Sequence, residues 1–350
     1  MTIEWATFVA GLASNPMLVA VTLLNIGVIV VNGATDAPNA IATVVSTRCM
    51  SARTAIIMAA ICNFFGLLII TLVSAAVANT IFHMVDFGGN NQAALLALLA
   101  AMVAIIVWGV VTWFFGIPTS QSHSLIAGLT GAAVALQGGF DGVNWGEWVK
   151  VIYGIVLSTF LGFGSGWALS KAIARLCRGF DRMKLDHFFK WAQIAAGAGV
   201  AFMHGAQDGQ KFMSVFILAI TLATGVGSAD QMTLPIWLML FCALNMGLGT
   251  AIGGKKIIKS VGMDMVKLEK YQGFAASFGA TICLLIATFG GLPVSTTHTK
   301  TTAIMGVGAA KCKKSVKWSI AVDMVKTWVL TFPGCGLLGF AFGRLFLFFS

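Results

Sequence analysis

The chain has 350 residues, of which 58 % are hydrophobic and only 10 % are charged, with a formal net charge of +10. Soluble domains carry about 25 % charged residues, so this composition excludes an ordinary soluble enzyme or binding domain. Apolar runs of about 20 residues, the length that spans a bilayer, recur along the whole chain. The sequence therefore predicts an all-α polytopic protein embedded in a lipid bilayer.

In the first half, residues 17–47 are predicted to cross the membrane inward and residues 54–82 outward. Residues 93–136 begin and end at polar breaks on the same side, so they are predicted to form a helical hairpin that enters from outside. Residues 148–176 then cross inward. The second half repeats this order of broken helix, helix, hairpin and helix in the opposite direction, over residues 189–224, 234–253, 271–310 and 318–348.

The direction of each crossing follows from the basic residues. Most of the 22 Lys and Arg residues gather in four polar breaks, near residues 48–53, 171–190, 255–270 and 311–317. The other breaks contain none. The positive-inside rule places the basic loops in the cytoplasm and both chain ends outside. Because the positive charge is divided among these loops, no nucleic acid partner is expected.

The repeated order predicts two inverted-topology repeats with broken helices and two re-entrant hairpins. We expect a first membrane repeat at 1–176, a cytoplasmic linker at 177–188 and a second membrane repeat at 189–350. Such repeats are typical of secondary transporters, which bind substrate near the midplane of the bilayer at discontinuous helices.

The two predicted hairpin tips read GIPTSQSH at 116–123 and GLPVSTTH at 291–298. Gly and Pro end one helix, and Pro favours the first turn of the next. The following polar residues then lie at a helix N-terminus, where backbone N–H groups and the helix dipole bind anions. An alternative is that the hydroxyls bond only to their own backbone. The candidate donors to a tetrahedral oxyanion are Thr119, Ser120, Gln121, Ser122, Ser295, Thr296 and Thr297.

A second pair of motifs, NGATDAPNAIAT at 32–43 and HGAQDGQKFMSV at 204–215, places a carboxylate inside each apolar span. Intramembrane carboxylates are costly and are functional candidates by default. Their glycines, and Pro38 in the first copy, would allow the helix to unwind. We expect Asp36, Asn39, Gln207 and Asp208 to hold Na⁺ or to carry H⁺, unless the carboxylates only cap a helix break. A carboxylate beside an anion site requires a cation between them.

Other ionisable residues lie near these motifs. Lys211 follows Asp208 by three residues, and Lys300 follows the second tip, so each would either neutralise phosphate or form an internal ion pair. For His123, His204 and His298 a structural, hydrogen-bonded role is expected, with a role in proton transfer as the alternative. The seven cysteines form no C-x-x-C pair, and neither a disulfide nor a metal site is expected from them. No cofactor is expected.

The motifs GATDAPNA, HGAQDGQK, PTSQSH and PVSTTH resemble those of the inorganic phosphate transporter family. The resemblance implies a symporter, not an enzyme, that moves orthophosphate with Na⁺ or H⁺ and usually forms a homodimer. It implies a multi-pass protein of a bacterial plasma membrane. It assigns the phosphate site to Thr119, Ser120, Ser122, Ser295, Thr296 and Thr297. It assigns the cation site to Asp36, Asn39, Gln207 and Asp208.

The chain departs from the family pattern in places. Thr35 and Gln207 stand where an Asn usually precedes the Asp, and Asn63 stands where sodium-coupled animal members resembling this chain carry Glu. The absence of Glu at Asn63, and again at Ala276 and Ser277 before the second hairpin, favours H⁺ over Na⁺ as the coupling ion. Bacterial members carry phosphate together with a divalent metal. Whether this chain carries the metal as well stays open from the sequence.

Two other functions remain open from the sequence. One is a symporter for sulfate or another tetrahedral oxyanion on the same fold. The other is a membrane-embedded hydrolase, which would need a single cluster with a nucleophile or metal-ligand spacing. The duplicated motifs argue for a transport pathway instead.

Overall fold

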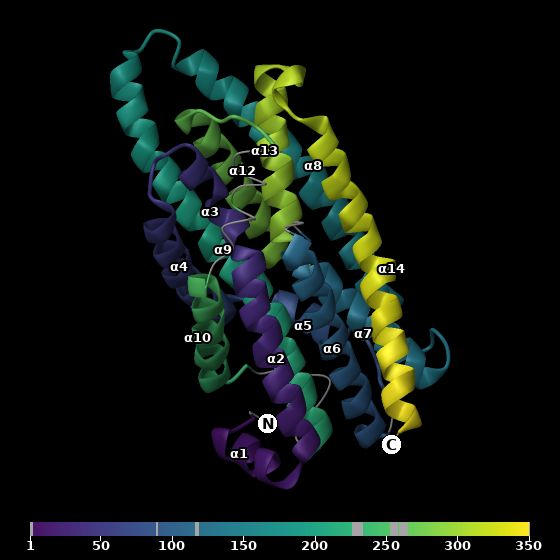
Figure 1. Cartoon of the computed structure of the whole chain (residues 1–350). Coiled ribbons are helices and arrows are strands. Elements are labelled where there is room, and N and C mark those ends of the chain that lie inside the picture. The colour runs from purple at the N-terminus through teal and green to yellow at the C-terminus, as the bar shows by residue number, and fades with distance from the viewer. Residues whose placement is uncertain are drawn as a thin grey trace.

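A computed structural model describes residues 3–349, except 89, 116–118, 226–233, 253–257 and 259–264. The described residues fold into α-helices joined by loops, and Figure 1 shows them as an elongated bundle. Six of the helices described are long and apolar enough to span a membrane. Helix α1 and the C-terminal end of α14 lie at the same end of the bundle (Figure 1).

The first half contains eight helices in the described residues. They are α1 (Trp5–Ser14), α2 (Pro16–Thr35), α3 (Ala37–Ser46), α4 (Ala52–Val73), α5 (Ala76–Phe82), α6 (Asn91–Phe115), α7 (Gln121–Gln137) and α8 (Trp145–Leu176). Two of these differ from the sequence prediction. Helix α1 was not expected, and the predicted crossing at 54–82 is divided into α4 and α5.

The second half has the predicted succession of helices, except that its first helix is unbroken. It contains α9 (Arg182–Thr224), α10 (Ile236–Ile252), α12 (Lys270–Phe289), α13 (Thr296–Lys311) and α14 (Trp318–Phe348), with a 3₁₀ turn at Lys313–Ser315. Because α9 already begins at Arg182, part of the predicted linker at 177–188 is helical.

The predicted break in the first motif is present between α2 and α3, at Asp36. Pro38 lies in the first turn of α3, where its missing N–H costs no hydrogen bond. The backbone N–H of Asn39 donates to the Asp36 carbonyl at 3.0 Å. Proline therefore interrupts the helix at the carboxylate, as its ring chemistry requires.

The prediction of a helix break in the second motif is wrong, because α9 runs unbroken through Asp208. This copy has no proline, and its glycines serve close packing instead. A Cβ on Gly205 would lie 2.1 Å from the carbonyl oxygen of Asn63 in α4, and one on Gly209 would lie 2.6 Å from the side chain of Leu67. The glycines thus let α9 approach the α4 backbone.

The two hairpins are α6–α7 and α12–α13. The second tip is formed where α12 ends and Gly291 takes a positive φ of 65°, a conformation that glycine adopts without strain. The helix break expected at residues 116–118 lies outside the described residues. The tips meet inside the bundle, since the ring centroids of His123 and His298 are 4.4 Å apart. Helix α6 has 25 residues, which is longer than a short re-entrant arm requires.

Helix packing follows a paired pattern. Helix α13 packs on α8 and α7 on α14, so each hairpin packs against the last helix of the other half. In the same way α4 packs on α9 and α10 on α2. Two equivalent halves would produce this exchange, but the two predicted repeats stay a prediction. The inverted relation between them stays a prediction.

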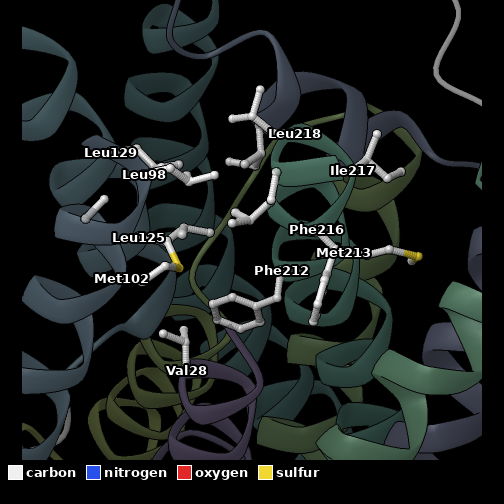
Figure 2. Packing of buried hydrophobic residues seen from close by; sticks show 14 of the residues in the cluster. Val28, Leu98, Met102, Leu125, Leu129, Phe212, Met213, Phe216, Ile217 and Leu218 are labelled. Carbon is white, nitrogen blue, oxygen red and sulfur yellow. The ribbon is translucent and has the colours of Figure 1, made fainter. Parts of the chain in front are cut away.

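An apolar cluster fixes α9 within the second motif. Figure 2 shows Phe212 beside Val28 of α2, with Met102 of α6 and Leu125 of α7 nearby. All four side chains are buried. The cluster holds α9 against the first hairpin within one turn of Lys211, so the polar residues of the motif are placed by apolar packing.

Candidate functional site

The two intramembrane carboxylates come together at the centre of the bundle. Asp36 lies at the α2–α3 break and Asp208 midway along α9. One ligand atom each of Asp36, His204 and Asp208 lie within 4.8 Å of one another, and all three side chains are buried. Two carboxylates this close cannot both stay charged without a cation or a proton between them. The geometry therefore suits cation or proton binding.

Asp208 is held by donors from three helices. Asn32 Nδ2 donates to Asp208 Oδ2 at 3.1 Å, and the Ser122 hydroxyl donates to Oδ1 at 3.0 Å. Lys211 Nζ donates to Oδ1 at 2.9 Å, so the internal ion pair considered for Lys211 is present. The first hairpin tip is thereby tied directly to the carboxylate on α9.

His204 completes this cluster from α9. Its Nδ1 is 2.9 Å from Asn63 Oδ1, and Asn63 Nδ2 donates to Thr250 Oγ1 at 2.9 Å, which fixes the amide orientation. Nδ1 is therefore the donor, and Nε2 lies 3.4 Å from Asp208 Oδ2. In the neutral ring, Nε2 presents a lone pair toward a carboxylate, so this side of the cluster is suited to a proton or a metal ion.

Asp36 and Asn39 reach the two tips from α3 and its N-terminus. The backbone N–H of Gln121 donates to Asp36 Oδ2 at 3.2 Å. Asn39 Nδ2 donates to the Thr297 hydroxyl oxygen at 3.0 Å. The first motif therefore contacts both hairpins, as a site shared by the two tips requires.

Lys211 bridges the tips from the other side. Besides Asp208, its Nζ donates to Ser122 Oγ at 2.7 Å and to the main-chain carbonyl of Val294 at 2.6 Å. Its side chain is fully buried. One ammonium group thus joins α9, the first tip and the second tip.

Ser120 and Ser295 occupy equivalent N-cap positions. Ser120 Oγ accepts the N–H of His123 at 3.3 Å, and Ser295 Oγ accepts the N–H of His298 at 3.2 Å. The capping alternative thus accounts for one lone pair of each hydroxyl. The O–H of each serine remains a donor, because no acceptor for it is found among the described residues. Both serines can cap their helix and still donate to an anion.

Three other tip residues differ in their surroundings. Thr119 hydrogen-bonds to Thr112 of α6 at 3.0 Å. The side-chain amide of Gln121 and the hydroxyl of Thr296 are buried and have no partner in the described part of the chain. Leaving buried polar groups unpaired costs about 1–3 kcal/mol each, which a bound ligand would recover.

Gln207 lies away from the carboxylates. Its Nε2 donates to the Thr288 hydroxyl oxygen at 2.9 Å and to the Leu292 carbonyl at 3.2 Å. Gln207 therefore braces the second hairpin near its tip. Its expected role as a cation ligand has no support from these contacts and stays a prediction.

Lys300 has no ion-pair partner among the residues with described positions. Its Nζ donates to Ser277 Oγ at 2.6 Å and to Thr43 Oγ1 at 3.1 Å, and the side chain is fully buried. The expectation of an internal ion pair is not met for Lys300. Neutralisation of a substrate anion is the remaining alternative.

Two of the three histidines differ from expectation. The ring nitrogens of His123 and His298 lack hydrogen-bond partners within the described ranges. The two rings pack edge to face. Two aromatic side chains of α14 cover them: the ring centroid of Phe332 is 4.8 Å from that of His123, and the ring centroid of Trp328 is 3.8 Å from that of His298. Ring packing, not hydrogen bonding, holds these residues, whereas His204 is hydrogen-bonded as expected.

Sequence reasoning missed several contributors to this centre. Asn32 is a polar residue inside an apolar helix, a signal that could have identified it. Asn63 was noted as a departure from the family pattern but not as a partner of His204. The Val294 carbonyl belongs to the main chain, so no side chain in the sequence indicates its contact with Lys211. The candidate site residues are buried, each no more than 4 % exposed. The centre is therefore buried in this conformation, and any substrate must enter through another one.

A buried polar centre with two carboxylates, built from a broken helix and two hairpins inside a multi-pass bundle, is typical of a membrane transporter. Comparison with known proteins then gives the family. The profile of the "Phosphate transporter family" matches residues 32–185 and 177–339. The chain belongs to this family.

Curated relatives agree with this assignment. A "Probable low-affinity inorganic phosphate transporter" of Bacillus subtilis is 37 % identical over 88 % of this chain and 91 % of its own length. One of Rhizobium meliloti with the same description is 36 % identical over 92 % of this chain and 94 % of its own. A solved structure, "The sodium-dependent phosphate transporter", superposes with a TM-score of 0.85 at 22 % identity. The superposition covers 96 % of this chain and 100 % of the solved one, so the two chains have the same fold.

Proposed function

We propose that this protein imports inorganic phosphate by symport with a cation, H⁺ or Na⁺, across the plasma membrane of a bacterium. The observation that carries this proposal is the meeting of two helix N-termini with two carboxylates in one closed centre. Family membership and the descriptions of the relatives support phosphate over sulfate. They also support transport over membrane-embedded hydrolysis.

Phosphate would bind between the tips of α7 and α13. The backbone N–H groups and positive dipole ends of both helices favour an anion there. The free hydroxyl donors of Ser120 and Ser295, the unpartnered amide of Gln121 and the hydroxyl of Thr296 would surround its oxygens. Thr119, Ser122 and Thr297 would position the tips through their contacts with α6, α9 and α3.

The coupling cation would bind next to this anion, at Asp36 and Asp208. Without a cation, the negative charge of phosphate would lie beside carboxylates in a medium of low dielectric constant, where repulsion is strong. Each ion then stabilises the other, so both travel together. A divalent metal carried with phosphate would meet the same requirement, and His204 Nε2 offers it a nitrogen ligand.

The closed centre belongs to an alternating-access cycle. We propose that the two halves are inverted repeats that rock against each other, with a boundary at the loop between α8 and α9. The basic loops would face the cytoplasm and both termini the outside. Assembly as a homodimer is the expectation that the family resemblance gives.

The test is uptake of radiolabelled phosphate into proteoliposomes, with Na⁺ and pH gradients imposed separately and sulfate as competitor. We expect concentrative uptake with one gradient and little competition by sulfate. The matched control is Asp323→Asn, which removes a carboxylate from an exposed ion pair of α14. Gradient-independent uptake, or equal competition by sulfate, would contradict the proposal.

A further inference from the structure

The two motif copies differ at one informative position. When Asp36 and Asp208 are aligned, Asn39 corresponds to Lys211, because each follows its carboxylate by three residues. Aligning the two tips on their N-cap serines pairs Ser122 with Thr297 in the same way. A neutral amide in one copy therefore matches an ammonium group in the other.

The contacts of these residues are also equivalent. Asn39 Nδ2 donates to Thr297 Oγ1, and Lys211 Nζ donates to Ser122 Oγ. Each copy thus connects its own helix to a hydroxyl at the same position of a hairpin tip. The first copy makes this connection without charge, whereas the second brings a positive charge into the centre.

The ammonium of Lys211 lies in an oxygen cage. A carboxylate oxygen of Asp208, the Ser122 hydroxyl and the Val294 carbonyl surround Nζ at 2.6 to 2.9 Å. Carboxylate, hydroxyl and main-chain carbonyl oxygens are also the ligands that hard cations take in proteins, and freed carbonyls hold Na⁺ in other transporters. The cage has the composition of a small monovalent cation site, with a tethered cation in it.

The charges around Lys211 fit this reading. Asp208 and His204 face it from its own helix, Asp36 from the α2–α3 break and His123 from α7. From the second tip, just before α13, the contact is the neutral Val294 carbonyl. The cluster thus holds two carboxylates against one covalently attached positive charge.

We propose that Lys211 is a tethered cation that occupies the place of one free coupling ion and so determines which ion drives transport. This inference rests on the proposed symport and specifies its ion requirement. Because the ammonium fills the cage permanently, Na⁺ cannot enter it. The chain itself then supplies the positive charge that a free Na⁺ would bring beside Asp208.

The test is Lys211→Asn, which gives the second copy the residue of the first. We expect Na⁺, compared with equimolar K⁺, to stimulate phosphate uptake by this variant about tenfold more than uptake by the unmodified protein. That ratio corresponds to about 1.4 kcal/mol of added ion binding. Lys211→Arg, which keeps the charge, should show no added stimulation. Lys326→Asn is the matched control, since Lys326 also follows an aspartate by three residues but lies in an exposed ion pair of α14.

A second readout does not depend on transport. In detergent, Na⁺ should raise the Tm of the purified Lys211→Asn variant more than that of the unmodified protein, because a ligand of the folded state stabilises it. A folded variant with neither added Na⁺ stimulation nor added Na⁺ stabilisation would overturn the proposal. Failure of the unmodified protein to take up phosphate would instead reject the proposed function, and the Na⁺ shift of Tm would still decide the role of Lys211.

Discussion

Replacement of Asp208 by Asn tests how the buried ion pair is balanced. Lys211 Nζ has Asp208 as its ion-pair partner in the described structure, at 2.9 Å, and both side chains are 0 % exposed. The substitution keeps the shape of the side chain but leaves the ammonium with only neutral oxygens, from Ser122 and Val294, in direct contact. Asp208→Asn should therefore destabilise the fold.

The expected size follows from measurements on other buried pairs, where removal of one partner costs about 3–5 kcal/mol. The low end, about 3 kcal/mol, applies here because the Ser122 and Val294 contacts remain and because Asp36 is close enough to attract Lys211. Asp36→Asn should be much milder, since Asp36 has no ion pair among the residues described. It also removes one of two like charges.

The assay is denaturant unfolding in detergent, followed by Trp fluorescence, for Asp208→Asn, Lys211→Met and the double variant. We expect the double variant to be more stable than Asp208→Asn alone, because it removes the unpaired charge. Asp36→Asn is the matched control, and both Asp variants should lose coupled uptake. If Asp208→Asn is as stable as Asp36→Asn, or if the double variant gains nothing, the buried pair does not have the energetic role described.

Three further predictions concern the tips, the orientation and the packing. Ser120→Ala and Ser295→Ala should each weaken phosphate binding about ten- to a hundredfold, since a hydrogen bond to a charged group contributes about 1.5–3 kcal/mol. Isothermal titration with nitrate as control measures this, and unchanged affinity in both would make the serines caps only. On a background without native cysteines, a cysteine at Phe140 should label from outside and one at Arg182 only after permeabilisation; outside labelling at 182 would reverse the orientation. Gly205→Ala should lower Tm, because its Cβ would lie 2.1 Å from a carbonyl oxygen; an unchanged Tm would refute the close packing of α9 on α4.

The sequence by itself determined the membrane class, the main apolar helices with their two hairpins, and the motifs that carry the polar centre. These features are local. A stretch of about 20 apolar residues must span the bilayer as a helix, because unpaired backbone groups are too costly in lipid. Pro38 interrupts its own helix for an equally local reason, and N-cap serines follow from the preference of helix N-termini.

Only the tertiary structure decided which polar groups meet. The second motif is rich in glycine, as helix breaks often are. Its glycines instead let α9 approach α4, and α9 continues as one helix. Lys211 pairs with a carboxylate, whereas Lys300 donates to hydroxyls alone. The difference depends on which side chains the packed helices place beside each lysine. The same holds for Gln207, which bonds to the second hairpin instead of the carboxylates. Hydrogen bonds between helices join residues far apart in the chain, so their partners are fixed by packing and not by any local pattern.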